Sequence, residues 1–127
     1  MNSSKTASTL FTLAVHDTGQ ANQLALRFAS AALHAGHRIN QVFFYHDAVH
    51  TANALQTPNP EDLVIDQDWA AIAATGGFSL CVCVAAAQRR GLTEHIGDCL
   101  NQGFELVGLG VYVAGIVDAD RLVTFSN

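Results

Sequence analysis

The stretch FSLCVCVAAAQRRG, residues 78–91, decides the fold because its character changes halfway along. Residues 78–84 are apolar at almost every position, which is typical of a central parallel strand covered by helices on both faces. Three alanines and a glutamine follow, and these residues favour a helix. The stretch therefore predicts a buried strand that leads directly into a helix beginning near Ala85.

The sequence before this stretch repeats the alternation of strand and helix. Residues 9–15 and 38–45 are short runs of apolar, β-forming side chains. Between them, residues 20–35 carry apolar side chains such as Leu24 and Phe28 at helical spacing, and a glycine follows. A strand, a helix and a second strand within about 40 residues are typical of a parallel βαβ unit.

The rest of the chain continues the same pattern without an internal repeat or an interdomain linker. Further helices are expected at residues 48–55, 66–75, 92–102 and 111–119, and further strands at residues 104–109 and 121–125. Residues 1–127 are therefore expected to form a single α/β domain, with helices layered on a mainly parallel sheet of about five strands.

Composition and charge exclude several classes of function. The formal net charge is -5, and the pair Arg89-Arg90 is not part of a basic stripe, so direct nucleic-acid binding is not expected. The polar residues 1–8 do not resemble a signal peptide, and no run approaches the roughly 18 apolar residues of a membrane span. We therefore expect a cytoplasmic protein. With 50% hydrophobic and 13% charged residues, it should leave apolar surface exposed, which indicates oligomerisation.

Cys83 is the candidate reactive group. It lies at the end of the predicted strand, and reactive groups of open α/β sheets gather at the carboxyl ends of strands. A helix N-terminus lowers the pKa of a thiol from about 8.5, and Arg89 and Arg90 would add positive potential. Position alone leaves a second interpretation open, in which Cys83 is a small buried hydrophobic residue.

The other two cysteines are expected to be structural. Cys81 lies on the same face of the strand as Cys83, and we interpret it as a core residue. The alternative is a sulfur relay or a strained disulfide between the two, at a Cα separation of about 6 to 7 Å. Cys99 lies on a predicted helix and is interpreted as a packing or surface residue, since a structural disulfide is not expected in a reducing cytoplasm.

The six histidines raise the possibility of a metal site. His34 and His37 both lie near the end of a predicted helix. His46 and His50 stand four residues apart. No Cys-x-x-Cys or His-Glu-x-x-His motif accompanies them, so we interpret them as solvated surface residues and expect no metal. The turn after the first strand lacks a phosphate-binding glycine motif, so no nucleotide or flavin cofactor is expected either.

Two histidines have a second possible role. His16 follows the first predicted strand and His46 follows the second, so both belong to the same sheet edge as Cys83. There they would help to orient or protonate a transferred sulfur.

Two segments carry a resemblance to a known family. CVAAAQRRG, residues 83–91, closely resembles the active-cysteine motif of the DsrE/TusD family of sulfurtransferase subunits. VFFYHDAV, residues 42–49, resembles the second strand of that family and the turn after it. Weaker similarity at residues 35–37, 108–110 and 119–125 extends the resemblance over most of the chain. The two motifs together favour a functional Cys83.

The resemblance implies a flavodoxin-like three-layer fold and a persulfide on Cys83. In the family, this cysteine takes sulfur from a TusA-like donor and passes it to a TusE/DsrC-like acceptor. TusB-like and TusC-like subunits, or their DsrH and DsrF counterparts, would complete a heterohexamer, and a homo-oligomer is the alternative.

The resemblance also implies the pathway. The leading expectation is 2-thiolation of the wobble uridine of tRNA, with the tRNA as final recipient of the sulfur and not as a ligand of this chain. Three alternatives remain open: a DsrE-type subunit in dissimilatory sulfur oxidation, a non-catalytic assembly subunit, and a histidine-based metal protein.

Overall fold

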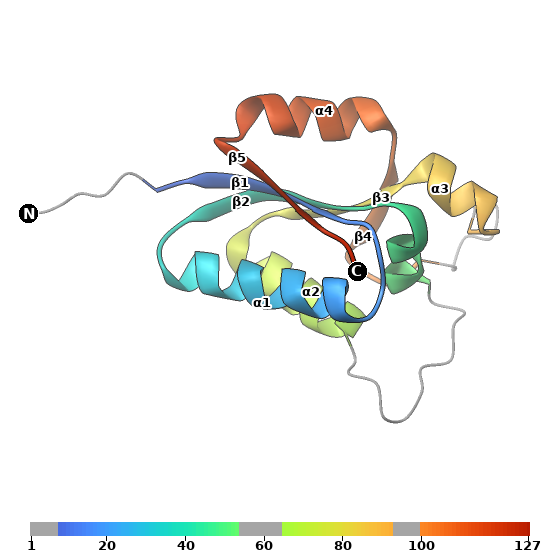
Figure 1. Cartoon of the computed structure of the whole chain (residues 1–127), viewed down its shortest axis with the longest axis horizontal. Coiled ribbons are helices and arrows are strands. Elements are labelled where there is room, and N and C mark those ends of the chain that lie inside the picture. Colours follow the sequence, from blue (N-terminus) through green and yellow to red (C-terminus); the bar gives the residue numbers. More distant parts are fainter. Residues whose placement is uncertain (1–7, 54–64, 93–99) are drawn as a thin grey trace, which may run out of the picture.

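A computed structural model describes residues 8–53, 65–92 and 100–127 of the chain (Figure 1). Its centre is a sheet of five parallel strands in the order β4-β3-β2-β1-β5. The strands are β1 (Leu10–Val15), β2 (Arg38–Phe44), β3 (Ser79–Cys83), β4 (Phe104–Val107) and β5 (Arg121–Phe125). The predicted parallel sheet is confirmed.

Helices cover both faces of this sheet. Helices α1 (Gln20–His34) and α2 (Ile65–Gly76) lie on one face, and α4 (Leu109–Asp118) lies on the other (Figure 1). The short helix α3 (Val84–Arg89) leaves the end of β3, and the 3-10 helix η1 (His46–Ala52) follows β2. The three layers confirm the expected α/β class, while the strand order differs from the 2-1-3-4-5 order of flavodoxin.

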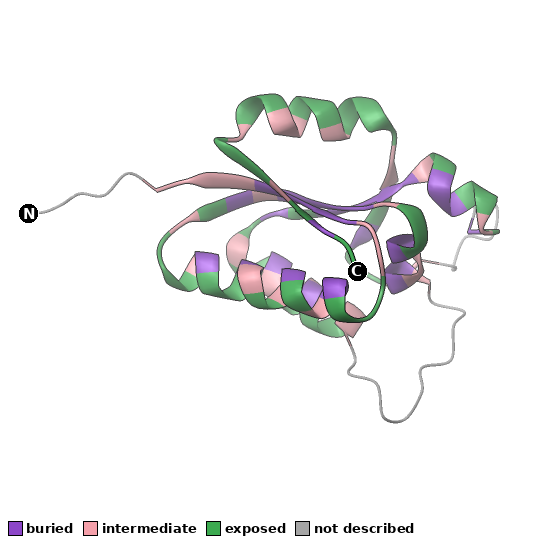
Figure 2. Cartoon of the chain, viewed as in Figure 1, coloured by how far each residue is buried: buried purple, intermediate pink, exposed green. Residues whose placement is uncertain are grey.

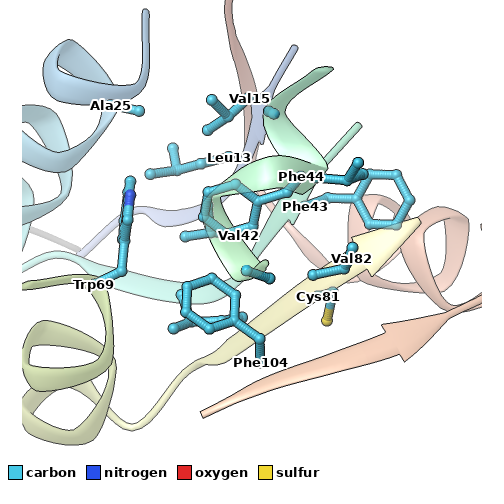
Figure 3. Close-up of a cluster of buried hydrophobic side chains, with 14 of the residues drawn as sticks. Leu13, Val15, Ala25, Val42, Phe43, Phe44, Trp69, Cys81, Val82 and Phe104 are labelled. Atoms are coloured by element: carbon cyan, nitrogen blue, oxygen red, sulfur yellow. The ribbon is translucent and has the colours of Figure 1, made fainter. Parts of the chain in front are cut away.

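The face under α1 and α2 holds most of the large apolar side chains. Trp69 of α2 is fully buried and meets Phe44 of β2 edge-on, with ring centroids 5.5 Å apart (Figure 3). Helix α1 approaches the sheet through small residues, because its buried apolar side chains are all alanines: Ala21, Ala25, Ala29 and Ala32. Leu24, which the helical pattern suggested as a core residue, is 57% exposed. In this core, large side chains of the sheet and α2 therefore pack against the small alanine side chains of α1.

The face under α4 is packed in a different way. The Asn40 side chain donates a hydrogen bond of 2.9 Å to the Gly115 carbonyl, and the Gln41 side chain donates one of 3.0 Å to the Tyr112 carbonyl. Gly115 permits this close approach, because a Cβ atom there would collide with the Gln41 amide. None of the α4 residues is buried, whereas α1 has a buried stripe (Figure 2).

The boundaries expected around Leu109 and Val84 differ from the structure. Leu109 begins α4 instead of ending a strand, because β4 pairs only with β3 and their last paired residues are Val107 and Cys83. Val84 likewise begins α3.

The helix expected over residues 92–102 does not extend to its predicted end. Leu100 forms an antiparallel bridge with Asn53, and the Asn101 N–H donates to the Ala52 carbonyl at 2.7 Å. This backbone is therefore bound to the end of η1. Residues 93–99, and residues 54–55 of the helix expected at 48–55, lie outside the described part of the chain.

Candidate active site

Cys83 lies where the sequence predicted, at the junction of strand and helix. It is the last residue of β3, and its extended backbone (φ -61°, ψ 116°) caps the start of α3. Helix α3 has six residues, with no acidic side chain in its first turn. Cys83 is a free cysteine, as is Cys81.

Cys83 is less exposed to solvent than is typical of a reactive thiol. Its side chain is 0% exposed, and the adjacent Ala86 and Ala87 of α3 are also buried. The thiol therefore lies under the rim of the sheet and not on its surface. A sulfur donor can reach it only when the side chains around it move.

Cys81 has a clearly structural environment. It is 1% exposed and lies in the hydrophobic core next to Val82 (Figure 3). Burial, together with the carboxylate of Glu105 on the neighbouring strand β4, raises the pKa of the Cys81 thiol to about 11. At neutral pH this thiol is almost entirely protonated, so it is a poor nucleophile.

Three aromatic side chains gather at the carboxyl ends of β1 and β2. The ring of His16 meets the ring of His46 edge-on with centroids 5.2 Å apart, and it meets the ring of Tyr45 at 5.7 Å. Tyr45 and His46 themselves are 4.1 Å apart. The predicted meeting of His16 and His46 at this rim is confirmed. We call His16, Tyr45 and His46 the rim cluster.

The rim cluster is a neighbour of Cys83 through the register of the sheet. Phe44 of β2 pairs with Val82 of β3. Tyr45 is the first residue after β2 and Cys83 is the last residue of β3, so both lie at the carboxyl edge of two neighbouring strands. Helix η1, which begins at His46, packs against both β3 and α3.

Electrostatics within the rim cluster favour the uncharged form of one imidazole. Burial lowers the pKa of His16, the nearby His46 lowers it further, and Asp17 opposes them with a smaller effect. His16 is therefore mostly neutral at pH 7.

An ion pair connects η1 with α3. Arg90 Nη2 lies 2.9 Å from the Asp47 carboxylate, and Arg90 Nε donates to the same oxygen at 2.9 Å. Arg90 Nη1 also donates to the Ala86 carbonyl. Asp47 therefore neutralises much of the positive potential that Arg90 was expected to supply at Cys83. Arg89 is exposed.

A buried network of side-chain hydrogen bonds fixes η1 from the other side. The sequence did not predict this network. The Trp69 indole N–H donates to the Asn22 side chain at 2.6 Å, and the Asn22 amide donates to the Thr51 hydroxyl. These hydrogen bonds join α2, α1 and η1. Their only signal in the sequence is an asparagine on a face of α1 that otherwise presents alanines to the core.

The remaining candidate residues do not form a site. Within residues 8–53, 65–92 and 100–127, no group of three histidine, cysteine or acidic residues could hold a metal ion. His37 Nδ1 accepts a hydrogen bond from the Thr9 N–H at 3.0 Å, and His34 is exposed. Cys99 lies outside the described residues. No helix in the described part of the chain has the length and hydrophobicity to cross a membrane.

Known proteins resemble this chain over most of its length. The DsrE/DsrF-like family model matches residues 8–125. A protein named "Putative sulfurtransferase DsrE" from Allochromatium vinosum is 42% identical over 117 residues, which cover 85% of this chain and 89% of the relative. A sulfurtransferase TusD from Sodalis glossinidius is 41% identical over 109 residues, covering 80% and 84% of the two chains.

A solved structure has the same fold. The crystal structure of the ychN protein from E. coli superposes with a TM-score of 0.75 and covers 94% of this chain and 100% of its own. At 21% sequence identity, this similarity concerns the fold alone.

Proposed function

The chain belongs to the DsrE/DsrF-like family, and we propose that it is a sulfur-relay sulfurtransferase subunit that carries sulfur as a persulfide on Cys83. The names of its relatives support a role in sulfur transfer. The observation that carries the proposal is the placement of Cys83 at the β3–α3 junction, at the sheet edge where the rim cluster lies. Cys81, the other thiol in the described part of the chain, has a raised pKa and is a poor alternative.

The proposed chemistry is an exchange of one sulfur–sulfur bond for another. The Cys83 thiolate attacks the outer sulfur of a donor persulfide, the bond within the donor breaks, and the donor thiol is released. A second exchange of the same kind passes the sulfur to an acceptor thiol. The expected donor is TusA-like and the expected acceptor is TusE/DsrC-like. Neither exchange needs a metal or an organic cofactor.

We propose 2-thiolation of the tRNA wobble uridine as the pathway served, in the cytoplasm. The second candidate is dissimilatory sulfur oxidation, because the relative from Allochromatium vinosum bears the name DsrE. Deletion of the gene would distinguish them: loss of 2-thiouridine from tRNA supports the first pathway, and loss of sulfur oxidation with normal tRNA supports the second.

The exposed face of α4 supports assembly with other subunits. Leu109, Val111, Val113 and Val117 of this helix are 50% to 77% exposed, an unusual density of large apolar side chains on one helix. We propose that subunits of the same family, TusB-like and TusC-like, complete a heterohexamer with this chain. A homo-oligomer is the alternative, and the mass of the complex isolated from its own cells would identify the composition.

The experiment that tests the proposed function is sulfur loading followed by intact-mass spectrometry. The full chain is incubated with a cysteine desulfurase, cysteine and a TusA-like carrier, and the wild type is compared with Cys83→Ser. We expect a gain of about 32 Da in the wild type and none in the variant. If neither protein gains sulfur with its authentic partners present, the chain is instead a non-catalytic assembly subunit.

A further inference from the structure

We propose that His46 takes up the proton that the Cys83 thiol loses when it accepts sulfur, and that His16 is the positioning residue that holds His46 at the rim. This inference rests on the proposed persulfide function and identifies the groups that assist it.

The backbone of His46 is the first observation. Its φ of 47° is the only positive φ of a non-glycine residue in the described part of the chain. Residues other than glycine rarely adopt this conformation, and where they do the surrounding structure holds them there, often at functional sites. A glycine would adopt it without strain. The strained position of this histidine is an argument for a role of its side chain.

Contacts on both sides of His46 enforce this conformation. The Tyr45 N–H donates to the Val15 carbonyl at 2.9 Å, and the Tyr45 carbonyl accepts the Ala48 N–H at 2.9 Å. Asp47, the next residue, is bound by Arg90, which directly follows α3. The left-handed turn between these fixed points places the imidazole of His46 against Tyr45 and His16.

The position of His46 in the sheet is the second observation. It follows Tyr45, the first residue after β2, and the last residue of β2, Phe44, pairs with Val82, the residue before Cys83. His46 itself is exposed, whereas Cys83 is fully buried. An exposed imidazole at the rim above a buried thiol is suited to exchange protons with an incoming donor and with solvent.

The charged groups around the rim cluster have binding partners of their own. The Asp47 carboxylate is neutralised by Arg90. Asp17, beside His16, accepts a hydrogen bond from the backbone N–H of Asn127 at 2.9 Å.

The proposed step balances in atoms and charge. The Cys83 thiol gives its proton to the His46 imidazole, and the resulting thiolate attacks the outer sulfur of a donor persulfide, R–S–SH. The bond between Cys83 and that sulfur forms as the donor S–S bond breaks, and the leaving R–S⁻ takes the proton from the imidazolium. The products are Cys83–S–SH and R–SH, without net oxidation or reduction.

The test compares His46→Gly with wild type in the sulfur-loading reaction, measured as a rate between about pH 5.5 and pH 9. Glycine relieves the left-handed backbone, so a purely structural role for His46 predicts an unchanged melting temperature and an unchanged or faster rate. Our proposal predicts a rate reduced roughly 10-fold to 100-fold at neutral pH with no loss of melting temperature. Added imidazole should restore part of the rate. A matched control is His34→Gly on the exposed end of α1, which should leave the rate and its pH profile unchanged.

A second variant tests the positioning role of His16. His16→Gln should shift the pH profile of loading while retaining a measurable rate, because the ring that contacts His46 is lost and His46 remains. If wild type loads sulfur on Cys83 and His46→Gly loads it at the same rate and pH profile, the role of His46 is wrong while the proposed function stands. If wild type itself does not load sulfur, both are wrong.

Discussion

Cys81 and Cys83 stand two residues apart on the same face of β3, and both are buried, yet their surroundings differ. Cys81 lies within the strand, paired in register with Phe43 on one side and Glu105 on the other. Cys83 lies at the end of the strand, where the backbone turns into α3. Burial therefore does not distinguish a structural thiol from a candidate nucleophile. The position of the thiol relative to the carboxyl edge of the sheet does.

The largest expected difference between the two thiols is in sulfur transfer. Cys83→Ala should lower the rate of sulfur uptake from a persulfide carrier roughly 100-fold or more, because the nucleophile is removed. Cys81→Ala should change that rate by a factor of about 3 or less, since a small apolar side chain replaces a protonated thiol in the core. Single-turnover transfer from a labelled donor measures both. Equal losses in the two variants would remove the distinction between them.

Alkylation in the Cys83→Ala variant tests the environment of Cys81. Because its pKa is raised from 9.0 to about 11, the fraction of thiolate below pH 9 should be about 100-fold smaller than in the unfolded chain. We therefore expect iodoacetamide to modify Cys81 at least about 100-fold more slowly in the folded protein than in urea. Peptide mass spectrometry separates this site from Cys99. Comparable rates in the folded and unfolded chains would contradict the buried, protonated state.

The same shift predicts how stability depends on alkaline pH. The folded chain holds the Cys81 proton up to about pH 11 and the unfolded chain loses it near pH 9.0, so this contribution is complete below pH 9 and is lost between about pH 9 and pH 11. It amounts to about 3 kcal/mol of unfolding free energy. Urea titrations of wild type and Cys81→Ala would measure it as a difference. Tyr112, whose pKa is also raised by burial, titrates in both proteins and cancels.

The smallest effect is expected at the ion pair beside Cys83. Asp47→Asn removes the carboxylate that binds Arg90, and because Asp47 is 64% exposed the loss of stability should be about 0.5 kcal/mol. Alkylation of Cys83 should become faster, because α3 is no longer tied to η1, while alkylation of Cys81 should not change. A matched control is Asp120→Asn, at the opposite end of the sheet, where the carboxylate accepts the Leu10 N–H. Equal changes at both thiols in Asp47→Asn would contradict a local effect.

The strand and helix order follows from the sequence because apolar runs and helical spacing are local signals. The β3–α3 junction was predicted within one residue, since Val84 and the alanines after it change the pattern abruptly. The buried face of α1 was harder to predict. Leu24 is exposed and Ala25 is buried, because the space on that face is filled by Trp69 and Phe44 from other elements.

The detail of the site depends on contacts distant in the sequence. The burial of Cys83 and the pairing of Arg90 with Asp47, 43 residues away, are set by how η1 and α3 pack together. The positive φ of His46 also has no local signal, because only a few per cent of residues other than glycine adopt it. The sequence could place Cys83, His16 and His46 at one edge of the sheet, but not the geometry that joins them.

The most direct test of the central claim is to locate the transferred sulfur within the peptide that contains both thiols. After loading from a persulfide donor and trypsin digestion, Cys81 and Cys83 remain in one peptide that ends at Arg89, and fragment-ion mass spectrometry separates them. We predict that the additional sulfur, about 32 Da, is found on Cys83 and not on Cys81. Sulfur found on Cys81, or divided equally between the two thiols, would contradict the account.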